Sequence, residues 1–481
     1  MMPFEGWALP WSFRMDQEMV SVLTEEGLPP LKQVSLSPQR LEVLLDVLRS
    51  GGPNLVRTPI SAVLLTVDRV AHRFLDPGDE LRKEALETVG AHGGFSGPMA
   101  REVLDGMAKG WTRPPLVALL HAEFRNPEVL DGFQPSRSRV EVRALGFPLS
   151  FHLGAGTVPG VGTTSMIRSL LVKSAVLLRP GRGDVPLSVL FARGLQEVDP
   201  ELSQAVAVAY WPRSQSAETE LVLERVDQVV VYGSDETVSW VRQRTPAATE
   251  LVAYRHRLGL GLVGRGALQG EKTEAAPPNM GTERKGARQT ALSAARAVAM
   301  FDQRGCVSPH LYFVEKGGEI GPEEWAEMLS QALSGLEEEL PSGPVSPEVG
   351  VALQQYRGKA EIEQSQGRGV VFHGGAAAPW TVAVEPDGVL EPTCMNRTVK
   401  VVPVGELTDA LESLHSWSRH LQTVGVAGLG GNRKKILDKL VELGSSRITG
   451  LDQIPWPPAW WHHDGAGPLR SLVRWTDVEG V

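Results

Sequence analysis

Apolar residues recur every three or four positions through the first part of the chain. In SPQRLEVLLDVLRSGG, Leu41, Leu44, Leu45 and Leu48 share one helical face, and a pair of glycines ends the run. Similar stretches follow at 61–74, 80–91 and 98–109. The pattern predicts a helical N-terminal portion over residues 1–135, without visible chemistry of its own.

From about residue 138, short apolar runs typical of strands alternate with helical stretches. TTSMIRSLLVKSA places Met166, Ile167, Leu170 and Leu171 on one helical face. The runs with the length and composition of strands are VEVRALG, AVLLRP, AVAVAYWP, DQVVVYG, TELVAYR and LGLGLVG. Strands that alternate with helices predict parallel βαβ connections in an open α/β sheet, which binds ligands at the carboxyl ends of its strands.

Residues 265–288 break this alternation. They lack periodicity and are rich in Gly, Pro and charge, which predicts a surface loop or a connection between domains. A second α/β stretch then runs from 289 to about 445, and it contains RQTALSAARAVAMF, HLYFVEK, PEEWAEMLSQALSGLEEEL, VVFHGG, WTVAVEP and NRKKILDKLVELG. We therefore expect an α/β fold with two α/β domains and a helical N-terminal portion.

Composition and charge narrow the class of protein. A chain of 481 residues fits two or three domains of about 100–200 residues each. A net charge of −9 argues against a nucleic-acid binder, which would be basic. Two cysteines exclude a secreted disulfide scaffold and suit a reducing compartment. The N-terminus does not have the pattern of a signal peptide, and no apolar run reaches the roughly 20 residues of a membrane span. We expect a cytoplasmic protein without a membrane span.

Cys306 is the first candidate for chemistry. It lies in FDQRGCVSPH, just past a predicted helix and at the mouth of an α/β layer, where open sheets gather ligands. Gly305 allows a backbone or a ligand to approach closely. The second cysteine, Cys394, forms no CxxC pattern with it, so no metal site is expected. These features favour a nucleophile that forms a thioester, and a small buried apolar residue is the alternative.

Three further stretches have the chemistry of anion or cofactor binding. Arg179 and Arg182 flank the RPGR turn directly after a strand, where two guanidinium groups can clamp a phosphate or simply be solvated. Gly233 and Ser234 lie between a strand and a helix, where a pyrophosphate can bind, although helix capping alone also explains them. The glycine-rich HLGAGTVPG can line a pocket or turn the chain.

Together these segments resemble the acyl-CoA reductase family, which includes the fatty-acid reductase subunit of bacterial bioluminescence systems and is a divergent branch of the aldehyde dehydrogenase superfamily. The resemblance covers roughly residues 36–475. The segments on which the resemblance rests are, in order, HLGAGTVPG, LLVKSAVLLRPGRGDVP, VVVYGSDETV, FDQRGCVSPH, EPTCMNRTV and PPAWWHHDGAGPL. The order and spacing of these segments are more specific than any one of them.

The resemblance implies an aldehyde-dehydrogenase-like fold that binds NADP(H). Arg179 stands where the superfamily usually has a lysine for the adenosine ribose. Arg182 stands where NAD-preferring members often have a carboxylate, and an arginine there suits a 2′-phosphate. Gly233 and Ser234 resemble the Gly-Ser that touches the cofactor near its pyrophosphate. Glu391 is the nearest match to the carboxylate that holds the nicotinamide ribose.

The same resemblance assigns the role of nucleophile to Cys306. This sequence departs from the superfamily pattern at two places. Thr157 occupies the position of the usual oxyanion-stabilising asparagine, and its hydroxyl can donate one hydrogen bond with a shorter reach. ELVAYRHRLGLGLV replaces the segment that carries the water-activating glutamate of hydrolytic members. His256 lies in this segment, as a candidate base or as a packing or surface residue.

The implied reaction is the NADPH-dependent reduction of an acyl thioester, on CoA or an acyl carrier protein, to the aldehyde through an acyl-Cys306 thioester. A CoA-acylating aldehyde dehydrogenase and a weakened subunit that binds nucleotide or acyl carrier remain alternatives. The expected domains are a helical portion packed on the cofactor domain (residues 1–135) and an NADP(H)-binding Rossmann-type domain (136–270). A catalytic domain (289–445) and a C-terminal segment (446–481) follow. A homodimer or homotetramer is expected, with VEVRALGFPLSF and LVRWTDVE as candidate pairing arms.

Overall fold

A computed structural model of the chain describes residues 2–15, 19–136, 139–270, 286–375, 378–385 and 391–479. The chain forms two compact units, one from residues 1–255 and 458–481 and the other from residues 256–457. Most of the predicted loop at 265–288 lies outside the described residues. Among the helices in the described ranges, none has the length and apolar character needed to cross a membrane.

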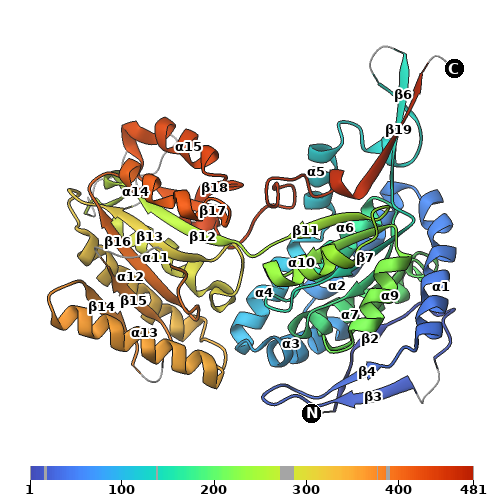
Figure 1. Cartoon of the computed structure of the whole chain (residues 1–481), viewed down its shortest axis with the longest axis horizontal. Helices are drawn as coiled ribbons and strands as arrows, with labels where there is room; N and C mark the ends of the chain where they lie inside the picture. Colours follow the sequence, from blue (N-terminus) through green and yellow to red (C-terminus); the bar gives the residue numbers. More distant parts are fainter. Residues whose placement is uncertain are drawn as a thin grey trace. The chain divides into compact units, whose positions relative to one another are not determined.

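The first unit centres on a mostly parallel sheet. Its strands are β2 (Trp7–Ala8), β7 (Leu149–Leu153), β8 (Ala175–Arg179), β9 (Val206–Ala209), β10 (Gln228–Tyr232) and β11 (Glu250–Tyr254), in the order β11-β10-β7-β8-β9-β2 (Figure 1). Strands β7 to β11 are parallel, and β2 pairs antiparallel with β9. The strand order reverses between β7 and β10, so their carboxyl ends flank the crevice where such sheets bind ligands.

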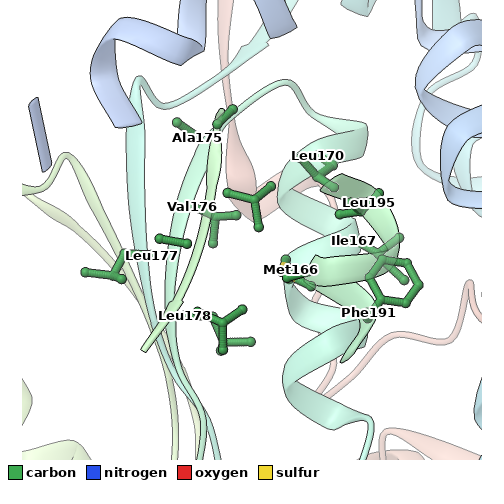
Figure 2. Close-up of a cluster of buried hydrophobic side chains, with 14 of the residues drawn as sticks. Met166, Ile167, Leu170, Ala175, Val176, Leu177, Leu178, Phe191 and Leu195 are labelled. Atoms are coloured by element: carbon green, nitrogen blue, oxygen red, sulfur yellow. The ribbon is translucent and has the colours of Figure 1, made fainter. Parts of the chain in front are cut away.

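Helices cover this sheet and share one core with it. They are α1 (Pro38–Arg57), α2 (Ile60–Leu75), α3 (Glu80–Gly93), α4 (Gly97–Gly110), α5 (Arg113–Glu123), α6 (Val161–Leu171), α7 (Val185–Val198), α8 (Pro200–Ser203), α9 (Ser216–Arg225) and α10 (Asp235–Arg244). Figure 2 shows Met166 and Ile167 of α6 with Phe191 of α7, beside Val176 and Leu178 of β8. The N-terminal helices contribute to the same core through residues such as those of the Leu41–Leu48 face, so they belong to this unit.

Two small sheets complete the first unit. Strands β1 (Phe4–Glu5), β3 (Val20–Leu23) and β4 (Leu31–Val34) form one of them, and the hydrophobic pattern did not predict it. The other consists of β5 (Gln134–Pro135), β6 (Val140–Gly146) and β19 (Val473–Glu479). In it the two predicted pairing arms meet, because β19 runs antiparallel to β6 from Val473 opposite Gly146 to Glu479 opposite Val140 (Figure 1).

The second unit is a three-layer α/β structure. Its strands are β12 (Leu258–Val263), β13 (Pro309–Glu315), β14 (Val370–His373), β15 (Thr381–Val384), β16 (Thr398–Val404), β17 (Leu421–Ala427) and β18 (Arg447–Gly450), in the order β14-β15-β16-β13-β12-β17-β18. Only β14 is antiparallel in this described sheet. The helices are α11 (Ala287–Ala299), α12 (Pro322–Glu339), α13 (Pro347–Ser365), α14 (Leu407–Ser413) and α15 (Arg433–Glu442).

Side chains of this sheet alternate between its two faces, as period-two strands require. Tyr312 and Val314 pack with α11 and α12, whereas Leu311 and Phe313 pack with α14 and α15. Both faces are buried, which explains why HLYFVEK is a nearly continuous apolar run.

The structure moves two of the expected domain boundaries. LGLGLV was placed in the first α/β domain, but it forms β12 in the middle of the second sheet, between β13 and β17. Residues 446–481 were expected to form one segment, but β18 pairs with β17 in the second unit and the chain returns to the first unit at residue 458. A short apolar strand has no feature that identifies its sheet, because pairing partners are not visible in its own periodicity.

Candidate active site

Cys306 lies in a tight turn of the second unit. Helix α11 leads into a short 3-10 segment, Met300–Gln303, in which residues 301–303 all have positive φ, from 48° to 63°. The turn closes where the Ser308 amide donates to the Gly305 carbonyl oxygen at 3.0 Å. The Cys306 side chain is exposed, so the structure contradicts the reading of Cys306 as a small buried apolar residue.

Cys306 lies at a different edge of the sheet from the one expected. Cys306 precedes β13, so it lies at the amino ends of the parallel strands of the second unit, not at their carboxyl ends. His256, just before β12, lies at the same edge, because Gly259 pairs with Pro309. The general rule on carboxyl ends therefore does not explain the position of Cys306, which depends on the connection from α11 to β13.

Two histidines, His256 and His310, lie near this edge in different surroundings. His256 is exposed and is within electrostatic range of His310. His310 is buried, with Nδ1 2.9 Å from Thr393 Oγ1. Burial, and then the charge on His256, lower the pKa of His310 to about 4. His310 is therefore neutral at pH 7 and supplies no positive charge that would stabilise a thiolate.

Glu391 begins the described part of the segment that leads into β16, and its side chain is exposed. The same segment carries Cys394, whose Sγ is 3.5 Å from Thr398 Oγ1. Residues 395–397 of this segment also have positive φ, from 49° to 63°. Non-glycine residues in this conformation cost of order 1–3 kcal/mol each and persist where the surroundings hold them. Both cysteines thus lie beside a strained stretch.

In the first unit, the glycine-rich loop packs directly on the RPGR turn. Gly154 N donates to the Arg179 carbonyl oxygen at 2.9 Å. A Cβ on Gly181 would lie 2.2 Å from Gly156 N, so only glycine allows this contact between backbones. Thr157 lies in this loop with an exposed side chain. Two of the stretches selected from the sequence therefore form one surface at the carboxyl edge of the sheet.

The two arginines of the RPGR turn have different surroundings. Arg179 Nε donates to the Trp211 carbonyl oxygen at 3.0 Å, and its guanidinium lies 5.9 Å from the centre of the Tyr210 ring. Arg182 Nε donates to Glu25 Oε2 at 2.9 Å, while Nη1 and Nη2 contact His92 and the Pro29 carbonyl oxygen. The expected role of Arg182 in binding a 2′-phosphate does not fit this geometry, because the ion pair with Glu25 neutralises its charge.

Gly233 and Ser234 follow β10 as predicted. Ser234 is the N-cap of α10, and its hydroxyl accepts a hydrogen bond from Thr237 N at 3.3 Å, which confirms the predicted capping. Sequence reasoning missed Arg213, whose Nη2 donates to Thr237 Oγ1 at 3.1 Å. Burial lowers the pKa of the Arg179 guanidinium, and like-charge repulsion from the exposed Arg213 lowers this pKa further. The only signal of Arg213 in the sequence is its place shortly after the strand AVAVAYWP.

Neither Arg179 nor Arg213 forms an ion pair with a carboxylate in the part of the chain that the structure describes. Two nearby cations without an ion-pair partner favour a bound phosphate, whereas Asp235 and Glu236 in the first turn of α10 would repel one. Among the described residues, no cluster of three or more His, Cys, Asp and Glu side chains could hold a metal ion. The first unit therefore has two cationic side chains near the carboxyl edge of its sheet, and the second unit has an exposed thiol.

Comparison with known proteins shows the family of the chain. The family described as acyl-CoA reductase (LuxC) matches residues 55–475. The chain belongs to the acyl-CoA reductase (LuxC) family. The "Long-chain acyl-protein thioester reductase" of Aliivibrio fischeri is 22% identical over 417 residues, which cover 85% of this chain and 80% of that protein. The "Long-chain acyl-protein thioester reductase 2" of Photobacterium leiognathi is 22% identical over 375 residues, which cover 76% and 70%.

Solved structures show the fold. Aldehyde dehydrogenase 21 from Physcomitrella patens aligns with a TM-score of 0.73 at 12% identity and covers 99% of this chain and 98% of that one. Methylmalonate-semialdehyde dehydrogenase from Oceanimonas doudoroffii gives the same TM-score at 14% identity and the same coverage. The expected aldehyde-dehydrogenase-like α/β fold is confirmed, and this member of the acyl-CoA reductase (LuxC) family is an oxidoreductase.

Proposed function

We propose that the chain reduces an acyl thioester, carried by CoA or a carrier protein, to the aldehyde at the expense of NADPH. The observation that carries this proposal is the exposed thiol of Cys306 in a turn next to a strained segment. The match to the acyl-CoA reductase family and the names of the relatives, which act on long-chain acyl-protein thioesters, support the substrate class.

In the proposed reaction, the Cys306 thiolate attacks the thioester carbonyl carbon and the donor leaves as its thiol. The acyl group is then a thioester of Cys306, which is electrophilic enough to accept a hydride, unlike a carboxylate. When bound, NADPH supplies that hydride. The thiohemiacetal oxyanion takes hydrogen bonds from the Cys306 backbone N–H and, by resemblance, from Thr157. Its collapse releases the aldehyde and restores the thiolate.

Features at the carboxyl edge of the first unit support NADPH as the cofactor. The backbones of Gly156 and Gly181 are in close contact at the carboxyl edge, and Gly233 with Ser234 precedes the N-terminus of α10, where a pyrophosphate can bind. We assign the 2′-phosphate to Arg179 and Arg213, because Arg182 is paired with Glu25. Glu391 remains the candidate for the nicotinamide ribose, and His256 the candidate for a base; both side chains are exposed.

Covalent labelling tests this function. Incubation with radiolabelled palmitoyl-CoA should label the native chain, and Cys306→Ala should abolish both the label and NADPH-dependent aldehyde formation. Cys394→Ala is the matched control, since it removes the other cysteine of the chain. A native protein without label, or a Cys306→Ala variant that forms aldehyde at the native rate, would show that the proposed mechanism is wrong.

A further inference from the structure

Two left-handed stretches, residues 301–303 and 395–397, lie side by side at the amino ends of β13 and β16. Gln303 Nε2 donates to the carbonyl oxygens of Pro309 and Thr398 at 2.8 and 2.7 Å, and its Oε1 accepts from Thr398 N at 2.9 Å. Pro309 begins β13 and Thr398 begins β16. One buried amide therefore joins the segment that precedes Cys306 to both strands.

A buried ion pair makes the second connection. Arg397 has no exposed side-chain surface, and its Nε and Nη2 donate to Asp302 Oδ1 at 3.1 and 2.8 Å. Its Nη1 donates to Glu337 Oε2 at 2.7 Å. The other Asp302 oxygen accepts from Gly343 N at 3.1 Å. Asp302 thus has partners on both oxygens, and it lies four positions before the nucleophile.

This network exceeds what the connection of two strands requires. A parallel pair of strands is held by its own backbone ladder, and β13 and β16 have one from Leu311 opposite Lys400 onward. Burying an arginine with two carboxylates is expensive unless the geometry is nearly ideal. The arrangement instead fixes residues 301–303 in a conformation that non-glycine residues rarely adopt, directly before the Cys306 turn.

We infer that Arg397 is a positioning residue, which holds the Cys306 turn in its reactive geometry through its fork of hydrogen bonds to Asp302. This inference rests on the proposed role of Cys306 as nucleophile. Arg397 does not touch the reacting atoms in this scheme. It determines where the thiol lies when the acyl group arrives, and a small displacement of a nucleophile is enough to slow attack strongly.

The test compares Arg397→Lys, which keeps the charge and loses the fork, with Arg357→Gln. Arg357 is a matched control, a buried arginine of the same unit that donates to Thr381 Oγ1 and to the carbonyl oxygens of Gly375, Ala378 and Trp380. We expect Arg397→Lys to lower the rate of Cys306 acylation by palmitoyl-CoA at least tenfold, with an unchanged KM for NADPH. Arg357→Gln should lower the melting temperature and leave the acylation rate within about twofold.

A second probe separates this inference from the proposed function. The rate of Cys306 alkylation by iodoacetamide, followed by mass spectrometry in a Cys394→Ala background, reports the geometry of the turn without any acyl substrate. It should change severalfold in Arg397→Lys and in the isosteric Asp302→Asn. Folded variants with native rates of both alkylation and acylation would overturn the positioning role. An unlabelled native protein with altered alkylation in the variants would contradict only the acyl-transfer function.

Discussion

Arg179 and Arg213 are two cationic side chains at the carboxyl edge that form no ion pair with a carboxylate among the described residues. Arg179 is the last residue of β8, Arg213 follows the neighbouring strand β9, and Arg213 reaches the first turn of α10 through Thr237. A 2′-phosphate would accept hydrogen bonds from both and remove their mutual repulsion, whereas the ribose hydroxyl of NADH would not. If the proposed function holds, we expect these two side chains to determine the preference for NADPH over NADH.

Arg213→Gln should raise the KM for NADPH by about tenfold or more and leave the KM for NADH nearly unchanged. A charge-assisted hydrogen bond contributes roughly 1.5–3 kcal/mol, which gives the expected magnitude. Steady-state kinetics with both cofactors measure the effect. Arg101→Gln, on the exposed face of α4, controls for the loss of one surface charge. Equal increases for NADPH and NADH would remove Arg213 from the phosphate site.

Candidate residues could be chosen from the sequence where their own chemistry is distinctive, and their roles stay predictions. Contacts between residues that are remote in the chain could not be foreseen. Cys306 was selected because a rare thiol follows a glycine, and both features are local. The ion pair of Arg182 with Glu25 and the fork of Arg397 on Asp302 join residues far apart in the chain. The sequence around Arg182 is that of a phosphate turn, and only the position of the N-terminal strands shows that its charge is neutralised.

At the scale of elements, one carboxylate fixes the start of α6. Asp184 is fully buried, and its two oxygens accept from Gly160 N at 2.6 Å and Gly162 N at 2.8 Å. Gly160 is the N-cap of α6 and Gly162 lies in its first turn, directly after the loop that carries Thr157. Burial raises the pKa of Asp184 to about 7, against the hydrogen bonds from Gly160 N and Gly162 N, which lower it.

Stability of the first unit should therefore depend on pH through Asp184. A carboxyl whose folded pKa is raised contributes stability that is fully present below its unfolded pKa of about 4 and is lost as pH rises through about 7. Asp184→Asn does not titrate, so the free energy of unfolding of the native chain relative to this variant should fall between pH 4.5 and 8. The rise in the Asp184 pKa from about 4 to about 7 corresponds to a change of at most about 4 kcal/mol in the free energy of unfolding.

Urea unfolding of both proteins at the two pH values measures this difference. Asp199→Asn is a useful control, because Asp199 also accepts from a backbone amide at a helix start, Leu202 N at 3.0 Å. If the free energy of unfolding of the native chain relative to Asp184→Asn instead rises with pH, the two amide donors hold Asp184 ionised and the prediction is wrong.

Elements were easier to predict than their assembly. The strands and helices from Val140 to Val263 appear close to where periodicity placed them, including the Ser234 cap. The assignment of β12 to the first sheet was wrong, because pairing between strands is set by contacts that LGLGLV does not encode locally. The small N-terminal sheet was missed for a related reason, since its strands are only two to four residues long.

At the scale of the whole molecule, the β6–β19 arm is the candidate for self-association. Strand β19 is an edge strand over seven residues, and most of its side chains are exposed. Trp475 is 48% exposed although it contacts Phe124. An open edge that carries an exposed aromatic side chain favours pairing with another chain. We propose that this arm mediates the homodimer or homotetramer.

Trp475→Ser should shift the protein towards monomer, with a dissociation constant raised about tenfold or more, because aromatic anchors dominate the energy of such interfaces. Mass photometry and sedimentation velocity across a range of protein concentrations measure the shift. Trp11→Ser is the matched control, since Trp11 is 65% exposed in the same unit but lies outside the arm. A native chain that is monomeric at micromolar concentration, or a Trp11→Ser variant that dissociates as readily as Trp475→Ser, would contradict association through this arm.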